Sequence, residues 1–219
     1  MLPVVINKRE AISFGWQKFK SDLGYWLGLM AIALVVFVVP TYIAKNLTGV
    51  ADGLSFMVTL AAWVLQLAVG LGLIGISLKV NDGIQPPVSY LFGYFNFIWR
   101  YLLASLLYGL IIFVGLILLL IPGVVWGVKY SLFAFFIVDK GARPLEALQL
   151  SADATQGVKG QLTLFLLLLG LINMVGAIAF GVGLLVTMPI TYLAWARVYR
   201  QLSSRPPVPV LNQSTKQAA

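Results

Sequence analysis

The sequence contains no cysteine and no histidine. Their absence excludes disulfide bonds, thiol chemistry, zinc sites that need these ligands and acid–base catalysis by imidazole. Charge is also scarce, because Asp, Glu, Lys and Arg make up 10% of the 219 residues, whereas a soluble domain carries about 25%. So few charged side chains cannot cover a water-soluble surface. We therefore exclude an ordinary soluble enzyme and expect a chain solvated mostly by lipid, with no metal ion and no cofactor.

Hydrophobic residues dominate what is present: they are 60% of the chain, and the mean hydropathy is +0.95. Uncharged stretches cover residues 23–44, 53–78, 101–128 and 160–196, and a helix needs about 20 apolar residues to cross a bilayer. The third stretch is interrupted at Ile121-Pro122-Gly123 and its apolar character resumes over residues 130–138. The fourth is too long for one crossing, and Gly181-Val182-Gly183 is its natural turn.

These patterns predict an all-α, polytopic membrane helical bundle of about six transmembrane helices, paired as three hairpins. The predicted helices cover residues 23–44, 54–79, 101–121, 123–139, 160–181 and 184–202. The helix over 123–139 is the shortest of the six, and a re-entrant half-helix is the alternative there.

The basic residues predict how the bundle is oriented. Lys and Arg total 15 against 7 Asp and Glu, and they separate the apolar runs instead of forming a patch, which argues against a nucleic-acid partner. Thirteen of them fall at the termini and in the loops 79–100 and 139–159, whereas Lys45 stands alone on the other side. The positive-inside rule then predicts a plasma-membrane protein with cytoplasmic N- and C-termini. Anionic lipid headgroups are the expected counter-charges.

An internal repeat is visible in two turns with the pattern V-x-x-G-x-x-P, at residues 80–86 and 138–144. The glycine permits a turn with positive φ, and the proline suits the first turn of a helix. We expect one transmembrane domain over 1–202, with pseudo-repeats at about 8–80, 81–139 and 140–202, followed by a Pro-rich cytoplasmic tail over 203–219. Each repeat would consist of a short interfacial amphipathic helix and a membrane hairpin.

The three short segments differ in composition. In the first, Ile12, Trp16, Phe19 and Leu23 are predicted to share one helix face. The third, at 145–155, has a similar apolar face, and the second, at 90–99, is rich in aromatic residues typical of headgroup depth. Anchoring the bundle in the interface is the expected role of such helices, and binding of a ligand is the alternative.

Three polar residues are predicted to lie inside spanning helices. Lys129 would cost about 2.5–3.5 kcal/mol at the membrane centre, so it should face the bundle interior, a water cavity or a lipid phosphate, or else reach toward an interface. Gln66 and Asn173 lie near the centres of their helices. We expect them to form interhelical hydrogen bonds, with a transport site as the alternative.

Asp139 and Arg197 complete the five candidate lipid or substrate contacts. Asp139 lies in a predicted cytoplasmic loop without a second carboxylate nearby for a metal site, and Arg197 is an expected snorkelling anchor. No phosphate-binding, serine-hydrolase or metalloprotease motif is present. Small residues at four-residue spacing could pack helices within one chain or form a dimer seam; they are Gly24/Gly28, Ala68/Gly72, Gly123/Gly127 and Ala177/Gly181.

Three blocks of sequence resemble a known family. They read Ala11-x4-Trp16-x2-Phe19-Lys20, then Ile121-Pro122-Gly123-x5-Lys129-Tyr130-Ser131, then Ile137-Val138-Asp139-x-Gly141-x2-Pro144-x-Glu146-Ala147-Leu148 followed by Ser151. Over residues 8–202 the chain resembles bacterial membrane proteins related to the membrane domain beside some glycerophosphoryl diester phosphodiesterases. The resemblance implies a helical bundle in the bacterial plasma membrane without catalytic residues of its own.

The leading functional hypothesis is a non-enzymatic integral membrane protein that organises the membrane by binding lipid or a membrane-protein partner, which includes a second copy of itself. The alternative is a small transporter or channel with a polar site near mid-membrane, as internal repeats and intramembrane polar residues suggest. An enzyme that acts on lipid headgroups is a third hypothesis and would require two carboxylates that converge at the inner interface.

Overall fold

The computed structural model describes residues 6–49, 51–118, 120–179 and 181–204, so most of the predicted tail over 203–219 lies outside the described residues. The described chain is all-α, as predicted. Its α-helices are α1 (Lys8–Ser21), α2 (Leu23–Leu47), α3 (Asp52–Asn81), α4 (Ile98–Leu118), α5 (Leu120–Tyr130), α6 (Phe133–Lys140), α7 (Pro144–Ala154), α8 (Lys159–Ile178) and α9 (Leu184–Ser203). Two 3₁₀ helices, η1 (Val88–Phe92) and η2 (Phe95–Phe97), precede α4.

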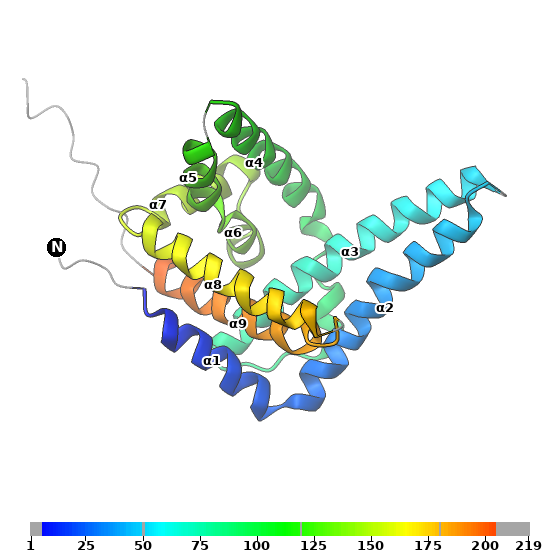
Figure 1. Ribbon diagram of the computed structural model, residues 1–219, viewed down its shortest axis with the longest axis horizontal. Coiled ribbons are helices and arrows are strands. Elements are labelled where there is room, and N and C mark those ends of the chain that lie inside the picture. The colour runs from blue at the N-terminus through cyan, green and yellow to red at the C-terminus, as the bar shows by residue number, and fades with distance from the viewer. Residues whose placement is uncertain (1–5, 50, 119, 180, 205–219) are drawn as a thin grey trace, which may run out of the picture.

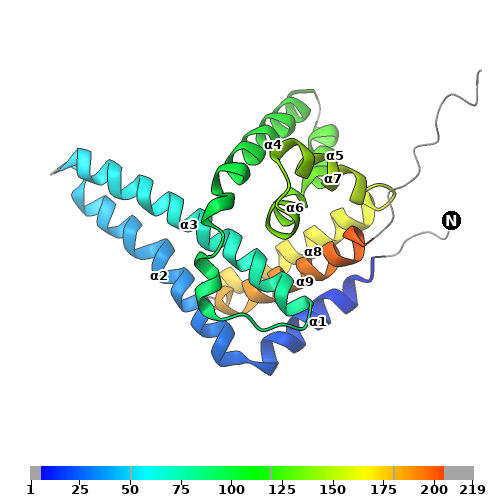
Figure 2. The same cartoon turned by 180° about the vertical axis from the view of Figure 1, so that it is seen from behind.

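The helices form the three predicted hairpins: α2 with α3, α4 with α5, and α8 with α9. Each hairpin follows a short element, namely α1, the η1–η2 segment or α7. The α2/α3 and α4/α5 hairpins diverge from each other, and α1 lies along α9 (Figure 1; Figure 2 shows the same arrangement from behind). The chain therefore has a common base from which hairpins project.

Five helical segments within the described residues are long and apolar enough to cross a membrane, which makes this a membrane-spanning chain. They are Leu23–Leu47, Asp52–Asn81, Val88–Leu118, Ile121–Lys140 and Lys159–Ile178. The sixth predicted span, 184–202, is helical as α9 but is not one of the five. Its last two turns carry Arg197 and Arg200, and it packs against α1, α3 and α8, so it is mainly a helix of the protein interior.

The predicted helix over 123–139 is interrupted, because α5 ends at Tyr130 and α6 begins at Phe133, although Ile121–Lys140 as a whole is long and apolar enough to cross a membrane. Side chains of α7 satisfy the backbone groups that the break releases. The hydroxyl of Ser151 accepts from the Leu132 N–H at 3.0 Å, and the hydroxyls of Ser151 and Thr155 each donate to the Lys129 carbonyl at 3.0 Å. Such partners permit a break that would otherwise leave buried polar groups unpaired.

The hairpin turn before α5 also differs from the prediction. Helix α4 ends at Leu118, and Pro122 and Gly123 lie in the first turn of α5 instead of forming the connection. A proline is tolerated there because the first N–H groups of a helix have no partner within the helix.

The short elements pack against the hairpins in ways that the apolar pattern did not predict. The face of α1 that is buried consists of Ala11, Gly15 and Phe19, whereas Trp16 and Leu23 are exposed. The aromatic segment forms 3₁₀ helices, and η1 approaches α3 so closely that a Cβ at Gly72 would overlap the Leu91 carbonyl. Gly72 is therefore a site of close backbone approach.

The apolar, membrane-facing surface and a group of charged residues lie at opposite ends of the hairpins. Large apolar side chains are exposed along the outer parts of α2, α3, α4 and α8, as expected of surfaces that contact lipid. At the opposite end, α3, α6 and α9 terminate together, and their ends carry Asp82, Asp139 and Arg200. We call this region the junction.

Candidate functional site

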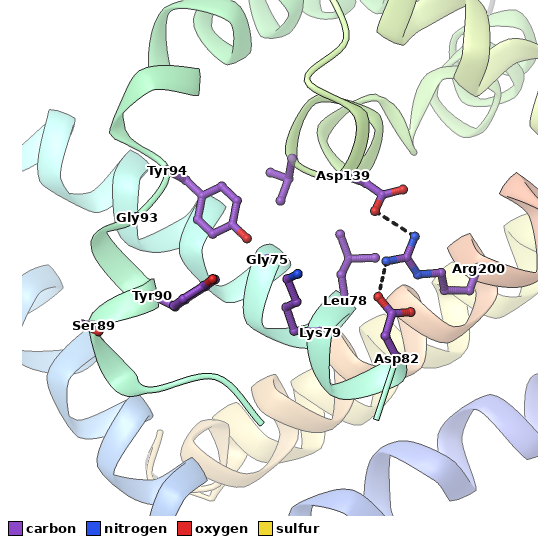
Figure 3. A pocket seen from close by; sticks show the side chains of 11 residues that line it. Gly75, Leu78, Lys79, Asp82, Ser89, Tyr90, Gly93, Tyr94, Asp139 and Arg200 are labelled. Carbon is purple, nitrogen blue, oxygen red and sulfur yellow. Dashed lines mark hydrogen bonds and ion pairs between the residues drawn. The ribbon is translucent and has the colours of Figure 1, made fainter. Parts of the chain in front are cut away.

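An ion-pair cluster holds the junction together (Figure 3). Nη1 of Arg200 donates to Oδ1 of Asp139 at 2.8 Å, and Nη2 of Arg200 donates to Oδ2 of Asp82 at 2.6 Å. The hydroxyl of Tyr199 donates to the other oxygen of Asp139 at 2.8 Å. One guanidinium thus pairs with carboxylates at the ends of α3 and α6, with Asp139 the more buried of the two at 18% side-chain exposure against 39% for Asp82.

The local sequence explains why these carboxylates meet. Both V-x-x-G-x-x-P turns end a helix, and Gly83 (φ 82°) and Gly141 (φ 62°) adopt the positive φ predicted for them. Tyr199 packs against Phe135 and Phe136, with ring centroids 5.3 and 4.9 Å away. This aromatic contact fixes the end of α6 against α9, so that Asp139 faces Arg200.

The ion pairs and hydrogen bonds of the cluster keep Arg200 charged and Tyr199 neutral. Burial alone would lower the pKa of Arg200, but the hydrogen bonds and charges of Asp139 and Asp82 outweigh it and raise that pKa. Burial, together with the hydrogen bond to Asp139, raises the pKa of Tyr199. Tyr199 is therefore a neutral hydrogen-bond donor to Asp139, and Arg200 remains charged.

A cavity of about 630 Å³ opens beside this cluster, and we call it the junction cavity. Its opposite side is formed by Lys79 of α3 and by Ser89, Tyr90 and Tyr94 of the η1 region. Figure 3 shows Lys79 and the two tyrosines directed into the same space. Tyr94 packs against Gly75, where any side chain would overlap its ring.

Lys79 is the charged group of the junction cavity that lies outside the ion-pair cluster. Within the described residues its ammonium makes no ion pair, whereas both carboxylates of the cavity are paired with Arg200. Together with the hydroxyls of Ser89, Tyr90 and Tyr94, the Lys79 ammonium gives the cavity several hydrogen-bond donors that are not engaged by the ion-pair cluster. That arrangement is suited to an anion with several acceptor oxygens.

The position of the cavity along the membrane helices is informative. Lys79 is the first charged residue after the uncharged run 53–78, so it marks where α3 leaves the apolar region. The segment from η1 to the start of α4, which borders the cavity, carries four exposed aromatic side chains, namely Tyr90, Phe92, Phe95 and Trp99. Aromatic residues of this kind favour the level of lipid headgroups.

Of the five candidates from the sequence, Asp139 lies in the junction cavity and the other four do not. Gln66 donates to the Phe37 carbonyl at 3.4 Å, and Asn173 accepts from Thr191 at 3.2 Å, so both form interhelical hydrogen bonds. The structure does not bring these residues together with Lys129.

The two basic candidates have separate surroundings. Lys129 lies in the last turn of α5, beside α7, with its ammonium 5.0 Å from the Tyr130 ring centroid, and is not in the interior of a continuous spanning helix. Arg197 pairs with Glu10 of α1 at 3.1 Å and lies over the Phe14 ring at 4.9 Å. Arg197 therefore fastens α1 to α9.

Sequence reasoning missed the roles of Lys79, Asp82 and Arg200: it used Lys79 and Arg200 only to predict orientation, and Asp82 only as part of the turn at 80–86. A usable signal was present, since each V-x-x-G-x-x-P turn carries an aspartate, Asp82 in one and Asp139 in the other. The carboxylate pair that a headgroup enzyme would require does converge here. Arg200 and Tyr199 engage both oxygens of Asp139 and one oxygen of Asp82.

Comparisons with known proteins find uncharacterised relatives in mycobacteria. The chain is 25% identical to uncharacterized protein Rv2560 of Mycobacterium tuberculosis and to uncharacterized protein Mb2590 of Mycobacterium bovis. Each alignment covers 89% of this chain and 68% of the relative. No protein-family model matches the sequence, and no solved structure matches it. The resemblance to the membrane domain of glycerophosphoryl diester phosphodiesterases therefore stays a prediction.

Proposed function

We propose that this protein is a non-enzymatic plasma-membrane protein that binds anionic phospholipid in the junction cavity. The observation that carries the proposal is the ammonium of Lys79, which makes no ion pair within the described residues and lies among the hydroxyls of Ser89, Tyr90 and Tyr94. A lipid phosphate would accept hydrogen bonds from these groups, and the negative charge would pair with the ammonium. The acyl chains would extend along the exposed apolar surface of the hairpins.

Binding is favoured over catalysis because the acidic groups of the cavity are already engaged. Arg200 pairs with both carboxylates, and the described residues hold no cluster of acidic groups that could bind a metal ion. The proposed orientation places the junction and both termini in the cytoplasm, where basic residues favour anionic lipid.

Native mass spectrometry of the detergent-solubilised protein tests the proposal with two added lipids, phosphatidylglycerol and phosphatidylethanolamine. We expect retained phosphatidylglycerol on the wild type and a loss of affinity of about tenfold in Lys79→Gln, since a charge-assisted hydrogen bond contributes about 1.5–3 kcal/mol. Lys140→Gln is the matched control, because it removes the same charge from the end of α6 but does not line the cavity.

Equal phosphatidylglycerol binding by Lys79→Gln and Lys140→Gln would contradict the proposal. Equal retention of the two lipids by the wild type would contradict the preference for anionic headgroups. The same spectra report the mass of the complex, so a protein companion or a second copy of the chain would be detected directly.

A further inference from the structure

Cavities follow one another along a single side of α3. Beyond the junction cavity lie a middle cavity of about 310 Å³ and an outer cavity of about 320 Å³ toward the far end of the α2/α3 hairpin. From the far end inward, α3 lines them with Ser55, Thr59, Trp63, Gln66, Gly70, Ile74, Leu78 and Asp82. Residues three or four apart share one helix face, so this face is hollowed along the length of α3.

The outer and middle hollows are contiguous, whereas the middle and junction cavities share no lining residue and are lined by consecutive residues of α3. Trp63 and Gln66 line both the outer and the middle cavity. The middle cavity reaches Ile74, and the junction cavity starts at the next residue, Gly75, where the Tyr94 ring packs on the helix backbone. Tyr94 thus stands at the boundary between the middle cavity and the junction cavity.

Polar groups line this route at every level. The outer cavity has Thr41, Thr48, Ser55 and Thr59, the middle cavity has Gln66, Tyr101 and Tyr192, and the junction cavity has Tyr90 and Tyr94. These groups offer hydrogen-bond donors and acceptors to a headgroup, and the hydroxyls of Thr41 and Thr59 also donate to carbonyls of their own helices. A lysine stands at each end, Lys45 in the outer cavity and Lys79 in the junction cavity.

The route is also open sideways to lipid. Phe37 and Trp63, which border the middle cavity, are 46% and 57% exposed, and the α2/α3 hairpin projects away from the α4/α5 hairpin on this side (Figure 1). A phospholipid could therefore keep its acyl chains in the bilayer while its headgroup lies in the polar hollow.

We infer that this face of α3 is a headgroup path along which phospholipids exchange between the two leaflets without an energy source. The inference rests on the proposed function, since the junction cavity is one end of the path and Lys79 receives the phosphate there. Lys45 receives it at the other end, and Tyr94 must move aside for passage. The substrate class is a phospholipid with an anionic phosphate, carried down its own gradient.

The experiment uses the purified full chain in liposomes of phosphatidylcholine and phosphatidylglycerol that contain phosphatidylglycerol with a fluorescent acyl chain. Dithionite bleaches label in the outer leaflet, so transbilayer exchange appears as continued bleaching beyond that fraction. We expect continued bleaching with the wild type. Gly70→Leu should return it to the level of protein-free liposomes, because a Cβ at Gly70 meets no atom within 4 Å and the side chain would fill the middle cavity.

Gly109→Leu is the matched control, since Gly109 also has open space around it but lies on α4 away from these cavities. It should exchange lipid at the wild-type rate. Wild-type liposomes that bleach no further than protein-free ones would overturn the inference, and so would equal rates for Gly70→Leu and Gly109→Leu. If Lys79-dependent binding of phosphatidylglycerol persisted in either case, the proposed function would stand and only the path would fail.

Discussion

Replacing Arg200 with methionine should destabilise the fold far more than the same replacement at Arg197, although the two residues lie one turn apart on α9. Arg200→Met keeps an unbranched side chain but removes the guanidinium, which leaves two carboxylates without their shared partner. Arg197→Met removes one ion pair to Glu10, and both side chains of that pair are more than a third exposed, Arg197 at 35% and Glu10 at 47%.

The magnitudes follow from the exposure of each pair. Removal of one partner from a buried ion pair costs about 3–5 kcal/mol, and Asp139, with 18% of its side chain exposed, is close to that case. The more exposed pair with Asp82 adds about 0–1 kcal/mol. We expect a loss of about 3 kcal/mol for Arg200→Met and of less than about 1 kcal/mol for Arg197→Met.

Unfolding in mixed micelles, with dodecyl sulfate added to a mild detergent, measures both variants against the wild type. Asp139→Asn combined with Arg200→Met completes a double-mutant cycle that isolates the coupling between the two residues. Equal losses for the two arginine variants, or a coupling energy near zero between Asp139 and Arg200, would refute the idea that this cluster holds the junction together.

Three further predictions concern packing, the α5–α6 break and topology. Gly72→Ala should lower the free energy of unfolding by about 1–3 kcal/mol in the same assay, because its Cβ would overlap the Leu91 carbonyl. Gly70→Ala, where a Cβ meets open space, should be neutral or stabilising by up to about 1 kcal/mol. A larger loss at Gly70 than at Gly72 would contradict this packing. Ser151→Ala should cost about 1–3 kcal/mol because it leaves the buried Leu132 N–H unpaired. Thr163→Ala, whose hydroxyl donates to the Lys159 carbonyl of its own helix, is the control that should change little. Single cysteines at Asn46 and Gln149, both exposed, should react with a membrane-impermeant maleimide from opposite sides of the membrane; reaction from the same side would contradict the proposed orientation.

Hydropathy predicted the three hairpins because a spanning helix needs about 20 consecutive apolar residues, and such a run is visible in the sequence itself. The bend between α5 and α6 could not be found in this way. It depends on Ser151 and Thr155, about 20 residues further along the chain, whose hydroxyls bond the Lys129 carbonyl and, in the case of Ser151, the Leu132 N–H. The absence of charged residues from 130–138 predicts an apolar helix there and gives no information about these hydrogen-bond partners.

The site was predictable only in part. Asp139 was singled out from a loop motif, but its partner Arg200 is 61 residues away. Lys79 is recognisable as a candidate anion contact only from the structure, because Arg200 already pairs with both aspartates there. Lys129 drew attention because it interrupts an apolar run. Its setting beside α7 depends on a tertiary contact that spacing along one helix does not reveal.

The central claim is that the ammonium of Lys79 binds a lipid phosphate, and a solid-state NMR experiment measures that contact directly. Protein labelled with ¹⁵N at lysine side chains, in bilayers that contain phosphatidylglycerol, is recorded with and without dephasing by ³¹P. The signal missing from Lys79→Gln identifies Lys79. The account predicts that this signal is dephased at the separation of a direct ion pair, while Lys140 is dephased less. A Lys79 signal that ³¹P leaves unchanged would contradict it.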